Sequence, residues 1–145
     1  MKKLALTAAL FLGLNMTAQA AKTCTNSDLT GEWGVEYFVS SPVFVGTCTI
    51  VLDNNMVPSG KCVNVNDTEE TDVFDGIGTI SKTCNVKTSM TFNNGLKIST
   101  VSKMAADKQY ISGSFTSSMK GKITKGKITF HKTGDLSCQV TPRGE

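Results

Sequence analysis

The residues able to do chemistry in this 145-residue chain are few, and their spacing favours binding over catalysis. His131 is the only histidine, so the sequence holds neither a histidine-pair metal site nor an H-E-x-x-H motif. It also lacks a G-x-S-x-G, P-loop or dinucleotide-binding glycine pattern. We therefore predict a protein that is not an enzyme and that carries no cofactor and no metal ion. We expect His131 to face solvent, since its neighbour Phe130 is expected to point inward.

Acidic residues crowd into one stretch of nine positions: Asp67, Glu69, Glu70, Asp72 and Asp75. Carboxylate oxygens are the ligands that Ca²⁺ prefers, but the spacing here follows no regular ligand pattern. A solvated acidic loop is the simplest interpretation. An electrostatic docking surface is the alternative, and it makes Asp67, Glu69, Glu70 and Asp72 candidates for binding a partner.

The C-terminal third of the chain is basic. Positions 97 to 145 hold nine basic residues and three acidic ones, and lysines are frequent from Lys120 to Lys132. This segment has few interleaved aromatic residues beyond Phe130, whereas single-stranded nucleic acids are usually bound with stacked aromatics. Lysines on the outer face of a strand also serve solubility. We predict no nucleic-acid partner.

The first twenty residues have the composition of a bacterial-type secretory signal. Met1-Lys2-Lys3 precedes an apolar run over 4–14, and Ala18-Gln19-Ala20 follows as a cleavage site. The run is shorter than the roughly 20 apolar residues of a membrane-spanning helix. Lys22 disfavours lipid attachment at Cys24. We expect cleavage after Ala20, which leaves a single domain of 125 residues (21–145) with a net charge of +1 in the periplasm or outside the cell.

From Gly31 onward, apolar and polar residues alternate in short runs that are broken by Gly, Asn, Asp and Ser. This period of two is typical of half-buried β-strands. Short connections favour an antiparallel up-and-down barrel of eight strands, because closure removes the two sheet edges. A β-sandwich is the alternative fold. The predicted strands are 31–40, 45–53, 57–66, 72–83, 85–92, 96–104, 109–124 and 127–133.

One hairpin register follows from keeping apolar side chains on a single face. A three-residue loop over 93–95, with Gly95 as its left-handed residue, pairs Phe92 with Leu96 and Met90 with Ile98. A two-residue Asn-Gly turn would place the two apolar sets on opposite faces. We therefore predict the three-residue loop.

The last hairpin is predicted in the same way. Ile111, Phe115 and Ile123 share one parity along the chain. A turn at Lys125-Gly126 would set Ile123 opposite Ile128 and keep both on the inner face.

All five cysteines follow the signal, and export places them where disulfides persist. A hairpin centred on Asn55 sets Cys48 opposite Cys62, so these two are predicted to bridge adjacent strands. In a closed barrel with an even number of strands, the start of the first strand lies near the end of the last, so Cys24 and Cys138 are predicted to join the termini. Cys84 is then the spare thiol, and a Cys62–Cys84 bridge is the alternative.

The segment Asp28-Leu29-Thr30-Gly31-Glu32-Trp33 resembles the opening of the calycin barrels, the group of lipocalins, avidins and bacterial periplasmic metalloprotease inhibitors. The resemblance implies that Trp33 plugs one end of a barrel and that a basic residue, here Arg143, packs across it. The avidins surround biotin with several tryptophans, and this chain has only one. The lipocalins carry Thr-Asp-Tyr, where this chain has Thr71-Asp72-Val73.

The inhibitor family is the most similar of the three. Its pattern is matched, in order, by Leu29-Thr30-Gly31-x-Trp33, Cys48-x-Ile50-x-Leu52 and Gly60-x-Cys62. The resemblance implies a disulfide between neighbouring strands and an N-terminal arm that enters a protease cleft. A Cys24–Cys138 bridge would leave only 21–23 as that arm.

We therefore predict an exported, non-catalytic binding protein that uses the barrel mouth or its loops to hold a small ligand or a protein partner. A periplasmic or secreted inhibitor of a protease or other hydrolase is the alternative, and a purely structural envelope protein is a third. The candidate binding residues are Trp33, Asp67, Glu69, Glu70, Asp72 and Arg143.

Overall fold

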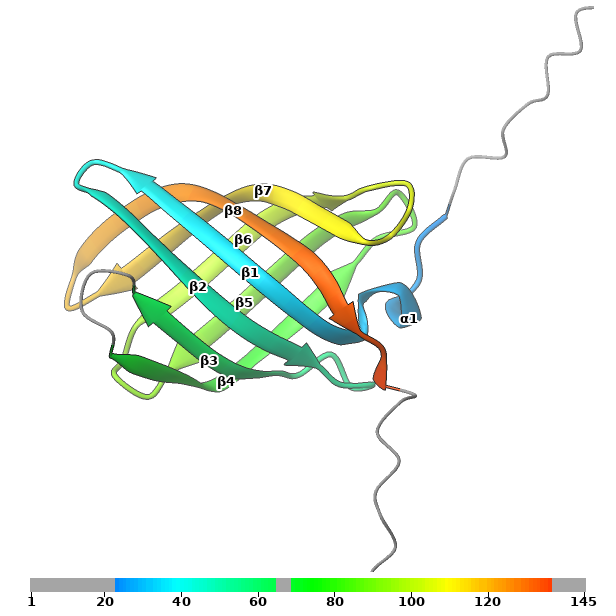
Figure 1. Cartoon of the computed structure of the whole chain (residues 1–145), viewed down its shortest axis with the longest axis horizontal. Coiled ribbons are helices and arrows are strands. Elements are labelled where there is room, and N and C mark those ends of the chain that lie inside the picture. The colour runs from blue at the N-terminus through cyan, green and yellow to red at the C-terminus, as the bar shows by residue number, and fades with distance from the viewer. Residues whose placement is uncertain (1–22, 65–68, 137–145) are drawn as a thin grey trace, which may run out of the picture.

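Eight antiparallel strands close into a barrel in the computed structural model, which describes residues 23–64 and 69–136 (Figure 1). Each strand pairs with its sequence neighbours and β8 pairs with β1, so the up-and-down barrel predicted from the sequence is confirmed. The elements are α1 (Asn26–Leu29), β1 (Gly31–Ser40), β2 (Val43–Leu52), β3 (Pro58–Asn64), β4 (Glu70–Ile80), β5 (Asn85–Phe92), β6 (Lys97–Met104), β7 (Tyr110–Met119) and β8 (Lys122–Gly134).

Alternation of side chains builds the core inside the barrel. In β5 and β6 every second residue is buried and the residues between are mostly exposed, as the period of two predicts. Among the residues that the structure describes, the buried side chains are apolar with three exceptions, Thr88, Thr100 and Ser102. The half of the barrel toward the closed end is filled by buried apolar side chains that include Val35, Ile50, Val86, Ile111 and Phe130.

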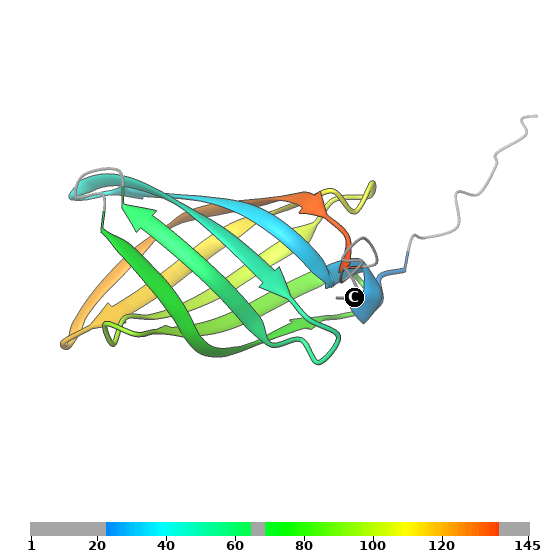
Figure 2. The same ribbon diagram turned by 60° about the horizontal axis from the view of Figure 1, so that its bottom comes forward.

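The two ends of the barrel differ. The short helix α1, the β4–β5 turn and the end of β8 lie at one end, which we call the closed end (Figures 1 and 2). The β1–β2, β5–β6 and β7–β8 turns lie at the other, which we call the open end. A helix preceding β1 thus covers one end only.

The β5–β6 hairpin has the predicted register. Phe92 N donates to the Leu96 carbonyl at 2.8 Å, and Met90 lies opposite Ile98. Gly95 has φ +83°, the left-handed conformation that a residue without a Cβ adopts readily. The requirement that both strands face the core with their apolar side therefore selects the three-residue loop.

The predicted turn at Lys125-Gly126 is wrong. The β7–β8 turn lies at Lys120-Gly121, both of which have positive φ, and β8 runs without a break from residue 122. Gly126 lies inside β8 opposite Phe115, and the Phe38 carbonyl together with the Phe115 ring fills the space that a side chain at 126 would take. A strand glycine here marks a close approach rather than a turn. Ile123 consequently lies opposite Ser118 instead of Ile128 and points outward.

Two disulfides join the described cysteines. Cys48 and Cys62 lie opposite each other in the β2–β3 ladder and are bridged, as predicted. The Cys24–Cys138 pairing is wrong, because Cys24 is bonded to Cys84. The segment before α1 runs beside the β4–β5 turn, where Cys24 N donates to the Lys82 carbonyl at 3.2 Å.

The Cys24–Cys84 bridge also corrects the assignment of Cys84 as a spare thiol and removes the Cys62–Cys84 alternative. Cys138 and the predicted signal, residues 1–20, lie outside the described residues. Two disulfides are typical of proteins from an oxidising compartment. In the described part of the chain, no helix has the length and apolar character that crossing a membrane would require.

Candidate functional site

Trp33 closes one end of the barrel. Its side chain is 0% exposed, and the indole Nε1 donates to the Leu29 carbonyl at 2.9 Å, which ties the ring to the end of α1. Lys132 lies over the ring, with its Nζ 5.6 Å from the ring centroid. The basic residue across the tryptophan is therefore Lys132 in β8, whereas Arg143 lies outside the described residues.

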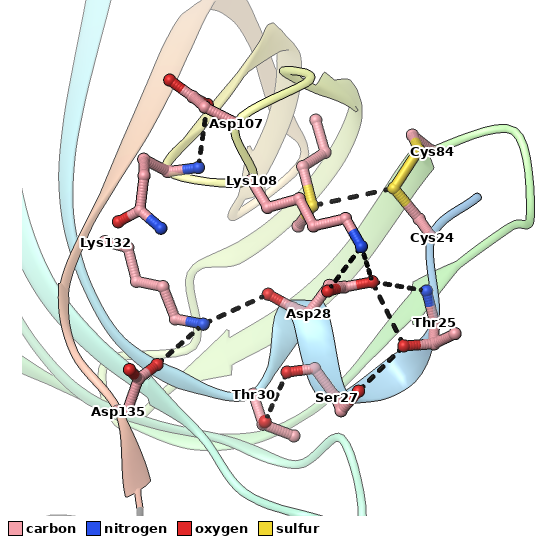
Figure 3. A network of polar contacts seen from close by, with 12 residues as sticks. Cys24, Thr25, Ser27, Asp28, Thr30, Cys84, Asp107, Lys108, Lys132 and Asp135 are labelled. Carbon is pink, nitrogen blue, oxygen red and sulfur yellow. Dashed lines mark hydrogen bonds and ion pairs between the residues drawn. A yellow bond between two sulfur atoms is a disulfide. The ribbon is translucent and has the colours of Figure 1, made fainter. Parts of the chain in front are cut away.

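Lys132 and Lys108 fasten α1 to the barrel. The Lys132 Nζ contacts an Asp135 carboxylate oxygen at 3.0 Å and the Asp28 carbonyl at 3.4 Å (Figure 3). The Lys108 Nζ lies 2.9 Å from the Asp28 carboxylate, which also accepts a hydrogen bond from Thr25 N at 2.8 Å. Burial favours the neutral form of Asp28, but the hydrogen bonds from Lys108 and Thr25 outweigh it and lower the pKa of Asp28. These contacts seal the closed end.

The open end contains a cavity of about 390 Å³ between the inner faces of the strands. The inner row of each strand points into it, because side chains at every second position face the barrel axis. Its apolar lining includes four aromatic rings and comes from both the early and the late strands. The main apolar residues are Tyr37, Phe44, Phe92, Leu96, Ile98 and Phe115.

The aromatic rings meet edge to face. The Tyr37 ring centroid lies 5.5 Å from that of Phe44 and 6.0 Å from that of Phe115, at interplanar angles of 74° and 80°. Two glycines make room for these rings, because a Cβ at Gly46 would meet Tyr37 and a Cβ at Gly126 would meet Phe115. The rings thus form an aromatic wall that offers apolar surface to a guest.

Polar side chains are placed around the rim of the same cavity. They come from the start of β4, the β5–β6 turn and the β7–β8 hairpin. Such groups orient a ligand whose body lies on apolar surface. The polar residues of the lining are Glu69, Thr71, Asn94, Ser117, Lys122 and Thr124.

The described acidic candidates do not form one site: one lies at the cavity rim, and two lie beside Lys61 on the outer face of the β3–β4 pair. Glu69 lines the cavity rim. Glu70 lies 2.9 Å from Lys61 across the β3–β4 ladder, and this hydrogen bond raises the pKa of Lys61. Asp72 is exposed on the outer face of β4, and Asp67 lies outside the described residues. Among residues 23–64 and 69–136, no three His, Cys, Asp or Glu side chains are grouped so that they would hold a metal ion.

Trp33 does not belong to the cavity, because it lies at the closed end. His131 is exposed as predicted, and its ring packs over Gly34 on the outer face. The aromatic cavity residues were not among the sequence candidates. The alternation of the sequence could have revealed them. In β1, β2, β5 and β7, one aromatic residue occupies an inward-facing position near the open end of the strand.

No protein-family model matches this sequence, and no curated protein is significantly similar to it.

Proposed function

We propose that this protein is an exported, non-catalytic binding protein that holds a small, largely apolar ligand in the cavity at its open end. The observation that supports this most directly is the cavity itself, which has an aromatic wall and a polar rim. Its volume falls within the roughly 300–1,000 Å³ typical of small-molecule sites. An eight-stranded barrel is also the size that accommodates one small ligand.

The closed end supports the same proposal. A ligand site in a barrel is favoured when one end excludes water. Here Trp33 and α1 cover the closed end. The half of the barrel next to the closed end is packed with apolar side chains, so a guest would rest on a preformed floor rather than pass through. Preformed sites lose little conformational entropy on binding.

Export and a calycin-like relationship belong to the same proposal. The residues before Ala20 have the pattern of a signal, and the two disulfides suit the compartment that it would give. Lys132 over Trp33 takes the part that the resemblance had assigned to Arg143. The contact between Lys132 and Trp33 supports a calycin-like barrel. It does not distinguish among lipocalins, avidins and inhibitors.

The hydrolase-inhibitor alternative draws on one feature, the Cys48–Cys62 bridge between neighbouring strands. Its expected inhibitory arm is less well supported, because Cys24 is buried and bonded to Cys84 before the chain enters α1. We therefore rank ligand binding first. Inhibition of a secreted metalloprotease by micromolar protein would reverse this order.

A fluorescent apolar probe tests the cavity. N-phenyl-1-naphthylamine is expected to gain fluorescence on titration with the wild-type protein and to be displaced by competing apolar compounds. Ser117→Phe, which adds a ring to the cavity lining, should abolish this signal. Ser114→Phe, on the exposed face of the same strand, is the matched control and should keep it.

Two outcomes would contradict the proposal. One is the absence of any probe binding by the folded wild-type protein. The other is an equal loss in Ser117→Phe and Ser114→Phe, because probe bound on the outer surface does not depend on the cavity.

A further inference from the structure

The β7–β8 hairpin ends in a tip that is both apolar and basic. We define the β7–β8 tip as residues 119–125. Ile123 is 66% exposed and Met119 is 42% exposed. Lys120, Lys122 and Lys125 are exposed beside them. Single exposed apolar side chains occur elsewhere on the barrel, for example Phe74 at 78%. The tip differs in combining two of them with three exposed lysines in seven residues.

Charge is distributed unevenly around the barrel. No acidic residue occurs between Asp107 and Asp135, so the whole β7–β8 hairpin carries only positive charges. Glu69, Glu70 and Asp72 lie at the start of β4, which is half-way round the barrel from β8. Glu69 and Glu70 are at the same open end as the tip, on the opposite side of its rim. An anionic surface would therefore attract the tip and repel that side of the rim, so we expect the barrel to dock tilted onto the tip.

We propose that the β7–β8 tip docks onto an anionic membrane surface. The lysines would lie among the anionic headgroups, and Ile123 and Met119 would enter the boundary with the acyl chains. The long aliphatic stems of lysine let the charged ends stay in the headgroup layer while the apolar side chains go deeper. The apolar groups of the tip suit the acyl chains of such a membrane, and its cationic groups suit the anionic headgroups.

The aromatic residues of the hairpin argue for a membrane over a nucleic acid. Binding to single-stranded nucleic acid usually uses exposed aromatics for stacking on the bases. Phe115 and Phe130 are buried inside the barrel, and Tyr110 begins β7 at the closed end. The tip itself contains no aromatic side chain.

Docking at this tip would bring the cavity mouth to the membrane. Met119 and Lys122 line the cavity and also belong to the tip, so the two features are continuous. A docked molecule would receive an apolar ligand directly from the bilayer. The docking proposal does not require the cavity to bind a ligand, and vesicle binding and probe binding are measured separately.

Co-sedimentation with vesicles tests the proposal. Full-length mature protein should sediment with vesicles of phosphatidylcholine mixed with phosphatidylglycerol, and far less with phosphatidylcholine alone. High salt should weaken the binding, because it screens the lysine charges. The double variant Lys120→Gln/Lys125→Gln should bind the anionic vesicles roughly 30-fold more weakly. Lys82→Gln/Lys103→Gln, which removes two exposed lysines near the closed end, should bind like the wild type.

A second pair of variants tests the apolar part. Ile123→Ser should weaken vesicle binding, whereas Ile77→Ser, at an exposed position on β4, should not. The proposal is overturned if the wild type does not bind anionic vesicles, or if the tip variants and their controls bind equally. Binding to an oligonucleotide in the absence of vesicle binding would also overturn it, in favour of a nucleic-acid partner.

Discussion

Tyr37 lies directly opposite Gly46 in the β1–β2 ladder, and its ring covers the space that a side chain at 46 would occupy. Gly46→Ala is expected to push the ring toward the cavity. The free energy of unfolding should fall by about 1–3 kcal/mol, the usual cost of overpacking, and the affinity for an apolar probe should fall with it. Urea unfolding and probe titration measure the two effects.

A double-mutant cycle checks the cause. Tyr37→Leu in the Gly46→Ala background should recover part of the lost stability, because the smaller side chain leaves room for the new methyl group. If the losses of stability in the two single variants simply add in the double variant, the Tyr37 ring and a side chain at residue 46 do not clash.

The two disulfides should contribute unequally to stability. The Cys24–Cys84 bridge spans 60 residues and the Cys48–Cys62 bridge spans 14. On the chain-entropy account, replacing each pair by serine lowers the free energy of unfolding by about 4 and about 3 kcal/mol respectively. Urea unfolding of the two double variants tests this order, and a larger loss for the shorter loop would contradict it.

Thiol labelling distinguishes the observed pairing from the one expected from the sequence. The two bridges leave Cys138 without a cysteine partner in its own chain. Alkylation of the unfolded, unreduced monomer should label one cysteine, and peptide mass spectrometry should place the label on Cys138. A label on Cys84 would restore the Cys24–Cys138 pairing.

The contacts of Asp28 predict an acid-sensitive closed end. Because the pKa of Asp28 is lowered on folding, its ionised form stabilises the folded state. This contribution is complete above the ordinary value of 3.8 and is lost as the pH falls toward the lower pKa of the folded state. Asp28→Asn should therefore flatten the acid side of the stability profile, and Lys108→Gln should do so in part. Profiles parallel to that of the wild type would contradict this role.

Ser102 carries a buried hydroxyl with no hydrogen-bond partner among the described residues. Ser102→Ala is expected to raise the free energy of unfolding by about 1 kcal/mol, because an unpaired polar group no longer has to be buried. Thr100→Val is the contrasting variant. It should lower stability by about 1–3 kcal/mol, since the Thr100 hydroxyl pairs with that of Thr88 at 2.8 Å.

The sequence by itself determined the features that depend on neighbouring strands. The period of two gave the strands, and the common apolar face of Phe92 and Leu96 gave the β5–β6 loop. The Cys48–Cys62 bridge followed from one hairpin centre. These predictions held because a short hairpin fixes which residues face each other, and its register is visible within a few residues of chain.

The tertiary structure alone decided the contacts between distant segments. Cys24 meets Cys84 because α1 turns the N-terminal segment across the end of the barrel, a path that no local pattern encodes. Gly126 was misread because a glycine marks a turn or a close approach equally well until the ring of Phe115 is placed. The cavity likewise depends on how far each inner row reaches along the barrel axis. That distance is set only when all eight strands close into the barrel. The strand tilt and the register then decide which inward-facing side chains lie at the same height along the barrel axis.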